Sequence, residues 1–231
     1  MPKIVVFDFW NTFPDHSALD FILRDYTDHH QTLATVTHRH INILSLYLSS
    51  LRKFTKFENL CLHALQLALF DLDLNFSMEQ MEEVVERLHR AKLFDDVDDT
   101  LIELREKGFK IALYSPLTVK FTTEILEANN INQYIDYIES AEDHPALLPS
   151  VDPIKHLANR FKDELDDPSH LVFVSGSGFS CGAAKVAHIP AMKVVRVARH
   201  PKSVACFGFV PCPNVVVHNL RELAEKISSL M

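Results

Sequence analysis

The chain has 231 residues, 47% of them hydrophobic and 23% charged, which is typical of a globular protein with one well-buried core and room for a modest insertion. Its formal net charge of −8 and its lack of a basic run argue against a nucleic-acid partner, because an acidic surface repels phosphates. Apolar runs are short and interrupted, so neither a membrane span nor a signal peptide is expected, and the sequence predicts a cytoplasmic location.

The first predicted element is a short apolar run, residues 3–7, that stops on an acid, Asp8. Consecutive apolar and β-branched residues predict a strand buried on both faces, as in a parallel sheet. A carboxylate directly after such a strand lies at its carboxyl end, where open α/β sheets form their ligand crevice. Asp8 is therefore a candidate site residue, although an acid at this place also serves simply to cap the following turn.

Helical periodicity follows, from residue 14 to residue 95. Apolar side chains recur at helical spacing in three stretches, which begin near Ile41, Leu60 and Met81. Ser77 precedes the last of these stretches and is expected to cap its amino terminus. We predict that this block is a helical domain inserted into a larger core.

From residue 96 onward, predicted helices and strands alternate. Helices are expected over 98–107, 119–128, 154–161, 181–187 and 220–230, and strands over 109–114, 134–138, 170–174, 192–197 and 215–217. Alternating strands and helices imply a parallel sheet covered on both faces. The predicted fold class is therefore α/β, with a doubly wound core of residues 1–13 and 96–231 and a helical cap domain of residues 14–95.

The four cysteines, Cys61, Cys181, Cys206 and Cys212, form no C-x-x-C pair. A structural zinc site is therefore not expected. We predict reduced, mostly buried thiols.

Asp8 and Thr12 form an Asp-x-x-x-Thr motif after an apolar strand, which resembles the opening motif of the haloacid dehalogenase superfamily. In that superfamily the Asp is the nucleophile and the Thr holds its second oxygen. The metal-dependent phosphatases of the superfamily carry a second Asp, the general acid, two residues after the nucleophile. This chain has Trp10 at that position. A core with an inserted cap is also the layout of the capped members.

Nearly the whole chain loosely resembles the metal-independent L-2-haloacid dehalogenases. Ser115 stands where that family has a Ser-Asn pair after a strand, but Pro116 replaces the Asn and removes its amide. After a later strand the family has Ser-x-Asn-x-x-Asp, and this chain has Ser175, Ser177 and Ser180 at those places. The resemblance thus implies that Ser115, Ser175 and Ser177 face the substrate.

Three further positions are less directly implied. The family's Lys is absent, and Lys155 falls where the family has a Tyr, so the amine of Lys155 is a candidate catalytic group. Arg39 is the nearest match to an arginine that the family uses in its cap. Trp10 directly follows the catalytic-type Asp, and it fits equally well as a pocket wall or as packing between core and cap.

The absence of the family's Lys, Asn and second Asp has a chemical meaning. In the dehalogenase mechanism the Asp displaces a halide to form an ester, which a water oriented by the Lys, the Asn and the second Asp then hydrolyses. This chain keeps the attacking group, Asp8, and lacks the groups that orient the water. Asp8 is also the only acid at the motif positions, whereas magnesium prefers several carboxylate or phosphate oxygens. The sequence therefore predicts no metal and no cofactor, and it argues against phosphatase activity.

The glycine-containing loop after residue 175 has other interpretations. Residues 178–182 spell G-x-S-x-G between a strand and a helix, but the acid and the histidine of a serine hydrolase do not follow in the required order. A dinucleotide-binding loop would need a ribose-binding acid about twenty residues on, and none is present. The backbone N–H groups at the start of the helix could instead bind an anion.

Three functions therefore remain open. The first is a metal-independent enzyme that acts on a small, largely apolar organic molecule, with Asp8 as general acid/base or hydrogen-bonding group in a non-hydrolytic isomerisation, elimination or cyclisation. The second is hydrolysis of a carbon–halogen bond, with Asp8 as nucleophile and with Lys155 and the serines replacing the lost groups. The third is a catalytically silent protein that binds a ligand or a partner. The sequence also leaves a homodimer open.

Overall fold

The structure is a computed structural model that describes residues 3–15, 17–143, 146–196, 211–227 and 230. Its centre is a parallel six-stranded sheet in the order β3-β2-β1-β4-β5-β6. The strands are β1 (Lys3–Asp8), β2 (Phe109–Ser115), β3 (Tyr137–Ser140), β4 (Leu171–Ser175), β5 (Ala191–Val194) and β6 (Val215–Val217). The strand order reverses next to β1, so the crevice of the sheet lies beside the carboxyl end of this strand. The predicted doubly wound α/β class is confirmed.

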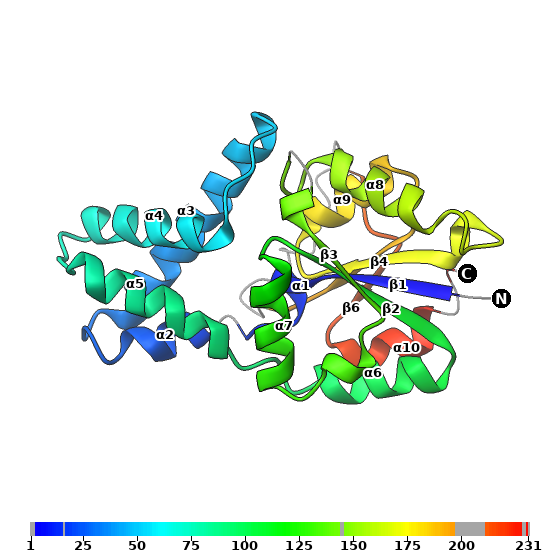
Figure 1. The fold of residues 1–231 in the computed structure, drawn as a ribbon, viewed down its shortest axis with the longest axis horizontal. Coiled ribbons are helices and arrows are strands. Elements are labelled where there is room, and N and C mark those ends of the chain that lie inside the picture. The colour runs from blue at the N-terminus through cyan, green and yellow to red at the C-terminus, as the bar shows by residue number, and fades with distance from the viewer. Residues whose placement is uncertain (1–2, 16, 144–145, 197–210, 228–229, 231) are drawn as a thin grey trace.

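Helices cover both faces of this sheet (Figure 1). One face carries α6 (Val97–Glu106), α7 (Val119–Ala128) and α10 (Leu223–Lys226), and the other carries α8 (Val151–Phe161) and α9 (Gly178–Val186). Every residue of β4 and all but the first residue of β1 are buried. Burial on both faces explains why these strands are continuous apolar runs in the sequence.

A separate helical block lies to one side of the sheet (Figure 1). It consists of α2 (Ser17–Leu23), α3 (His30–Ser50), α4 (Phe57–Asp71) and α5 (Met78–Arg87). These helices pack against one another in chain order, α2 on α3, α3 on α4 and α4 on α5. Ser77 caps α5 as predicted, in a capping box that Gln80 completes.

The two segments that connect the helical block to the sheet run side by side. Pro14 and Leu93 form an antiparallel bridge, and the N–H of Phe94 donates to the carbonyl oxygen of Phe13 at 2.9 Å. The N–H of Asp15 donates to the carbonyl oxygen of Lys92 at 2.8 Å. This pairing lies near the boundaries proposed from the sequence, residues 13/14 and 95/96, which remain a prediction.

Several element boundaries differ from the sequence prediction; among them, α8 begins at Val151 rather than 154, and β5 ends at Val194 rather than 197. The third strand was expected over 134–138 but begins at Tyr137, because Asn132–Tyr134 form a short 3-10 helix just before it. Helix α9 begins at Gly178 rather than 181, because Ser177 caps it. The last helix, α10, ends at Lys226, and residues 197, 228 and 229 of the predicted elements lie outside the described residues.

The cysteines also differ in part from the prediction. Cys61 and Cys181 are free and buried, as expected. Cys212 is exposed and disulfide-bonded, so the prediction of a reduced thiol is wrong there. Cys206 lies outside the described residues. None of the described helices is long and apolar enough to cross a membrane.

Candidate functional site

Asp8 ends the central strand of the sheet, at the switch in strand order. Its backbone pairs with Tyr114 near the end of β2, and the neighbouring strand on the other side, β4, ends at Ser175. The short helix α1 (Phe9–Thr12) follows at once and turns the chain away from the sheet. The carboxylate of Asp8 therefore lies at the carboxyl edge of the sheet, as the sequence predicts, and is only 1% exposed.

Uncharged donors surround the Asp8 carboxylate. The Ser175 hydroxyl donates to Oδ2 at 2.7 Å, and the Asn11 side-chain amide donates to the same oxygen at 2.9 Å. The hydroxyl of Ser180, in the first turn of α9, also bonds to this carboxylate. Ser175 in turn accepts the N–H of Ser177 at 2.9 Å, which ties the loop after β4 to the site. The carboxylate is thus held by groups that carry no charge.

Burial dominates the electrostatics of this carboxylate. It raises the pKa of Asp8, and the hydrogen bonds from Ser175, Asn11 and Ser180 offset only part of this effect. Burial and the negative charge of Asp8 together raise the pKa of the Tyr114 phenol. The pKa of the Cys181 thiol rises to about 12 for the same two reasons. A negative charge on Asp8 is therefore costly in this environment.

A cavity of about 310 Å³ opens above Asp8, between the sheet and the helical block. Helix α3 contributes Ile41, Asn42, Ser45 and Leu46, α4 contributes Phe57, and the loop after β4 contributes residues 176–178. The remaining walls are mostly apolar and include Trp10, Pro116, Leu147, Leu148 and Pro149. Asp8 is the only acidic or basic side chain among the described residues that line this cavity.

Trp10 forms part of the wall and also packs against the helical block. Its ring lies 4.5 Å from that of Phe57, between ring centroids. Both roles considered for Trp10 from the sequence are therefore present. A second, more polar cavity of about 530 Å³ shares Trp10, Asn11, Ile41 and Asn42 with the first. The two cavities thus meet at this wall.

Gly176 lets the loop after β4 approach α1 closely. A Cβ atom at this position would lie 2.1 Å from the carbonyl oxygen of Asn11, closer than any side chain tolerates. Glycine is therefore required for the two segments that carry Ser175 and Asn11 to meet over Asp8.

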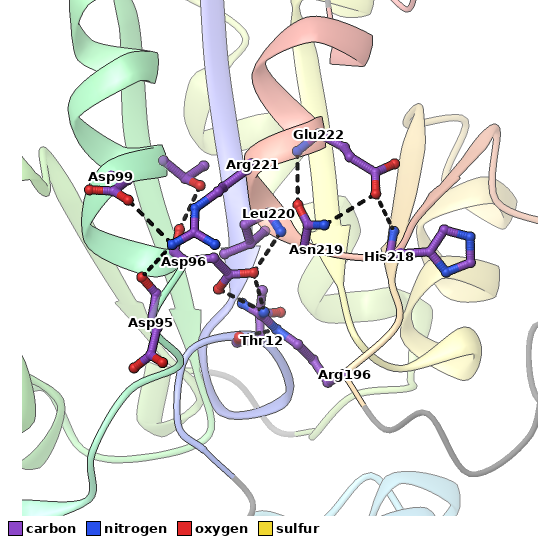
Figure 2. A network of polar contacts seen from close by, with 11 residues as sticks. Thr12, Asp95, Asp96, Asp99, Arg196, His218, Asn219, Leu220, Arg221 and Glu222 are labelled. Carbon is purple, nitrogen blue, oxygen red and sulfur yellow. Dashed lines mark hydrogen bonds and ion pairs between the residues drawn. The ribbon is translucent and has the colours of Figure 1, made fainter.

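A buried ion pair fixes the far end of α1 (Figure 2). Arg196 donates through Nη1 to both oxygens of Asp96, at 2.8 and 2.7 Å, and through Nε to the carbonyl oxygen of Thr12 at 2.7 Å. Asp96 also accepts the backbone N–H of Leu220 at 2.8 Å. The Arg196 guanidinium lies over the ring of Phe94, 4.2 Å from its centroid. This network anchors the turn that follows Asp8.

Two predicted residues are close to Asp8 in sequence or in the fold but do not contact its carboxylate. Thr12 is buried, and its hydroxyl has no hydrogen-bond partner among the described residues, so it does not hold the second oxygen of Asp8. Ser115 accepts from the Leu117 N–H at 3.2 Å and from the Thr122 hydroxyl at 2.7 Å. Ser115 therefore shapes the turn after β2 and does not line the cavity.

Arg39 and Lys155 lie away from the cavity. Arg39 is 60% exposed on α3 and pairs with Asp71 of α4 at 3.2 Å, because the face of α3 that covers the cavity carries Asn42 and Ser45 instead. Lys155 is exposed on α8, because the buried face of that helix carries apolar side chains such as Leu157. The expected approach of the Lys155 amine to the site is therefore not what the structure shows.

Sequence reasoning missed several residues that do meet at the site. Asn11 and Ser180 bond to Asp8, and Tyr114 lines the cavity. Ser180 was assigned no role, although the resemblance places it where the family has its second Asp. It also lies three residues after Ser177 at the start of a helix, and so on the same side of its first turn. No comparable pattern marks Asn42 or Ser45 within the long helix α3.

Metal ligands are scarce at this site. Within the described ranges, no group of three or more His, Cys, Asp or Glu side chains is arranged to hold a metal ion. Around Asp8 the available oxygens belong to serine hydroxyls and to asparagine amides. Such a donor set is a poor match for magnesium, which prefers charged oxygens.

A buried carboxylate at the carboxyl edge of a parallel sheet, beneath a cavity, lies where open α/β sheets form their ligand sites. A sequence model described as haloacid dehalogenase-like hydrolase matches residues 5–194. The chain therefore belongs to the haloacid dehalogenase-like hydrolase family, whose members are enzymes of hydrolase type.

Solved structures share this fold over the full chain. An L-2-haloacid dehalogenase from Xanthobacter autotrophicus, with chloropropionic acid covalently bound, is 20% identical, with all of both chains covered and a TM-score of 0.86. A defluorinating L-2-haloacid dehalogenase is 14% identical, with 98% of this chain and 95% of that chain covered and a TM-score of 0.80. A magnesium-bound HAD-hydrolase from Bacillus subtilis is 12% identical, with 98% of both chains covered and a TM-score of 0.75. At these identities the likeness establishes the fold alone. Among curated proteins, no sequence matches significantly.

Proposed function

We propose that this protein is a metal-independent enzyme that acts on a small, largely apolar organic molecule, with Asp8 as its general acid/base. One observation carries the proposal: Asp8 is the only acidic or basic side chain among the described residues that line the cavity, and it is almost completely buried. The reaction class that fits is an isomerisation, elimination or cyclisation, in which a proton moves and no water is added.

The cavity supports a small substrate. Its volume of about 310 Å³ lies at the lower end of the usual range for ligand sites. Trp10, Phe57 and Leu148 offer apolar walls, and Asn42 and Ser45 offer hydrogen bonds from α3. We infer that α2–α5 act as a cap that closes over such a molecule and excludes water.

The environment of Asp8 supports proton transfer. Burial raises the pKa of Asp8 above the usual range of an aspartate, which favours its protonated form and suits the group to proton transfer. Ser175 and Asn11 hold Oδ2 and thereby fix the orientation of the carboxyl group. A positioned carboxyl group of tuned pKa contributes typically 10²- to 10⁴-fold to a reaction of this kind.

The site offers little for a hydrolytic second step. Hydrolysis of an ester at Asp8 needs a base that activates water, and no such base lies among the described residues of the cavity wall. Serine hydroxyls hold a water but do not deprotonate it. Magnesium chemistry is disfavoured by the same donor set, so we expect any activity to be insensitive to EDTA and to added magnesium.

Dehalogenase-type hydrolysis, with Asp8 as nucleophile, is the second candidate. The observation that favours it is the set of donors on the carboxylate, from Ser175, Asn11 and Ser180. If an ester formed at Asp8, these donors would stabilise the oxyanion that appears when water attacks its carbonyl carbon. The fold match to an L-2-haloacid dehalogenase with covalently bound chloropropionic acid is consistent with this candidate.

Two isotope experiments separate these candidates. In the first, the protein reacts with 2-chloropropionate in heavy-oxygen water, and the mass of the peptide containing Asp8 is measured. We expect no heavy oxygen in the peptide and no catalytic release of chloride, because without a base for hydrolysis any ester formed at Asp8 would persist after one equivalent of chloride. Heavy oxygen in Asp8 together with released chloride would establish the hydrolytic mechanism instead.

In the second experiment, small apolar ketones and unsaturated esters are incubated with the protein in D₂O, and loss of their C–H signals is followed by NMR. We expect exchange that is catalysed by the wild type and absent in Asp8→Asn. If neither experiment shows a reaction while native mass spectrometry finds a bound small molecule, the protein is a ligand-binding member of the family without catalysis.

A further inference from the structure

A buried lysine lies beside the site, on a strand for which the sequence analysis predicts no functional role. Among the lysines that the structure describes, only Lys193 of β5 is counted with the buried residues, at 8% exposure. Neither the proton-transfer mechanism nor the hydrolytic alternative uses it. Burying an ammonium group is costly, so a position of this kind calls for an explanation.

The strand register places Lys193 on the same face of the sheet as the Asp8 site. Lys193 is aligned with Ser175 of the neighbouring strand, and Ser175 bonds directly to Asp8. Aligned residues on adjacent parallel strands direct their side chains to the same face. Two strand spacings, about 10 Å, separate the backbone of Lys193 from that of Asp8.

The end of the Lys193 side chain lies at the first turn of α9. Its Nζ is 3.7 Å from the point where a Cβ atom of Gly178 would be, and Gly178 lines the cavity above Asp8. Cys181, one turn further along α9, experiences both charges, since Asp8 raises the pKa of its thiol and Lys193 lowers it. The ammonium group therefore lies beside the first turn of α9, where its charge and that of Asp8 both act on Cys181.

The ionisable groups around Asp8 are few. Tyr114 comes from β2, Cys181 from α9 and Lys193 from β5, whereas the cavity-lining residues of α1, α3 and α4 are uncharged. Tyr114 and Cys181 both have raised pKa values and are therefore neutral near pH 7. Arg196 also approaches the cavity wall, beside Gly176, but its charge is paired with that of Asp96. Lys193 is the one group in this set that brings a positive charge without that ion pair.

We propose that Lys193 is the cation of this site: its ammonium group, held by β5 beside the first turn of α9, favours the ionised form of Asp8. Lys193 acts through Asp8 and is thus a positioning residue, not a catalytic one. Burial opposes the charge of each group, and the attraction between them offsets part of both costs. The inference deepens the proposed function, because it rests on Asp8 as the reacting group.

The test is a direct titration of Asp8 that needs no substrate. Protein labelled with ¹³C at the aspartate carboxyl carbon is titrated by NMR, and the Asp8 signal is identified as the one missing from Asp8→Asn. In Lys193→Met, we expect the midpoint of Asp8 to rise by about one pH unit, as Coulomb's law gives for a unit charge about 10 Å away at an effective dielectric constant of about 20.

Three further variants make the result specific. Lys193→Arg retains the charge and should keep the midpoint within a few tenths of a pH unit of the wild type. Lys185→Met removes a lysine from the last turn of α9, where its Nζ donates to Asn214, and should leave the midpoint unchanged. Lys193→Gln replaces Lys193→Met if circular dichroism shows that the latter is unfolded.

An unchanged midpoint in a folded Lys193→Met or Lys193→Gln protein would overturn the inference. An equal rise in Lys185→Met would also overturn it, because the effect would then reflect total charge and not the position of Lys193. Since the titration requires no turnover, the inference about Lys193 fails or succeeds independently of the reaction proposed for Asp8.

Discussion

Two buried carboxylates, Asp8 and Asp96, have similar exposure and opposite surroundings. They are 1% and 6% exposed. The Arg196 guanidinium donates hydrogen bonds to both carboxylate oxygens of Asp96, and the Leu220 N–H donates a third (Figure 2). Asp8 receives only hydroxyl and amide donors. The Asp96 carboxylate is thus neutralised by the Arg196 side chain, whereas the Asp8 carboxylate is buried without a cation in direct contact.

This difference separates a structural carboxylate from one that is able to react. The Asp96 pair connects the start of α6, the end of β5 and the turn after Asp8, and its charges compensate each other. A charge on Asp8 has no counter-ion in direct contact, and burial raises the pKa of this group. The predictions below test this contrast, in order of decreasing effect.

The largest effect is expected for Asp8→Asn. Asn is nearly isosteric but neither transfers a proton nor attacks as a carboxylate, so turnover of any substrate should fall by about 10³-fold or more. Stability should not fall, because the amide oxygen still accepts hydrogen bonds from Ser175 and Asn11 and no charge is buried. Steady-state kinetics and thermal unfolding measure the two effects. Full activity in the folded variant would refute both enzymatic candidates.

The pH dependence of stability gives a matching control for the same variant. Because the pKa of Asp8 is raised in the folded state, the wild type is stabilised below the unfolded pKa, about 3.8, and loses this contribution as the pH rises through the folded pKa. Asp8→Asn should therefore gain stability relative to the wild type as the pH rises above about 4. A constant difference across this range would mean that burial does not shift the pKa of Asp8.

Arg196→Met is expected to have the next largest effect, on folding. It leaves Asp96 buried without its partner, which should cost about 3–5 kcal/mol in the free energy of unfolding. Asp96→Asn in the same chain should recover part of this loss, because it removes the unpaired charge. Arg221→Met is the matched control, since Arg221 is exposed and pairs with Asp99 at the surface, so it should cost less than about 1 kcal/mol. Chemical denaturation compares the four proteins.

Ser175→Ala should have a smaller effect that is specific to the site. It removes one donor from Asp8, which should reduce activity by about 10- to 100-fold. Because the Ser175 hydrogen bond lowers the pKa of Asp8, the pH profile should also move upward. Ser115→Ala is the control: this serine bonds to Thr122 and not to Asp8, so it should affect stability but not the pH profile. Equal shifts in both variants would contradict the assignment.

The smallest effect is expected for Lys155→Met. The sequence suggests a catalytic role for this lysine, whereas the structure places it on the exposed face of α8. Activity should therefore remain within about twofold of the wild type, and the free energy of unfolding within ±0.5 kcal/mol. A drop of more than tenfold in kcat would mean that Lys155 acts at the site, which would require a different orientation of α8.

Local sequence patterns determine the sheet, the helical block and the place of Asp8. The apolar runs of β1 and β4 are continuous because both faces of these strands are buried, and this requirement is visible without knowing what covers them. An acid directly after such a strand must lie at the carboxyl edge of the sheet. The capping residue Ser77 was equally predictable, because a cap acts on the turn that immediately follows it.

Only the tertiary structure decides which side chains meet Asp8. Ser175 is 167 positions away in the chain, and nothing in the periodicity of α3 reveals that Asn42 and Ser45 cover the cavity while Arg39 faces Asp71. The two lysines show the reason most clearly. The rotation of α8 about its axis turns Lys155 to solvent, whereas the pleat of β5 brings Lys193 to the face that carries Ser175. Such orientations follow from how whole elements pack, because packing against distant segments, and not local propensity, fixes them.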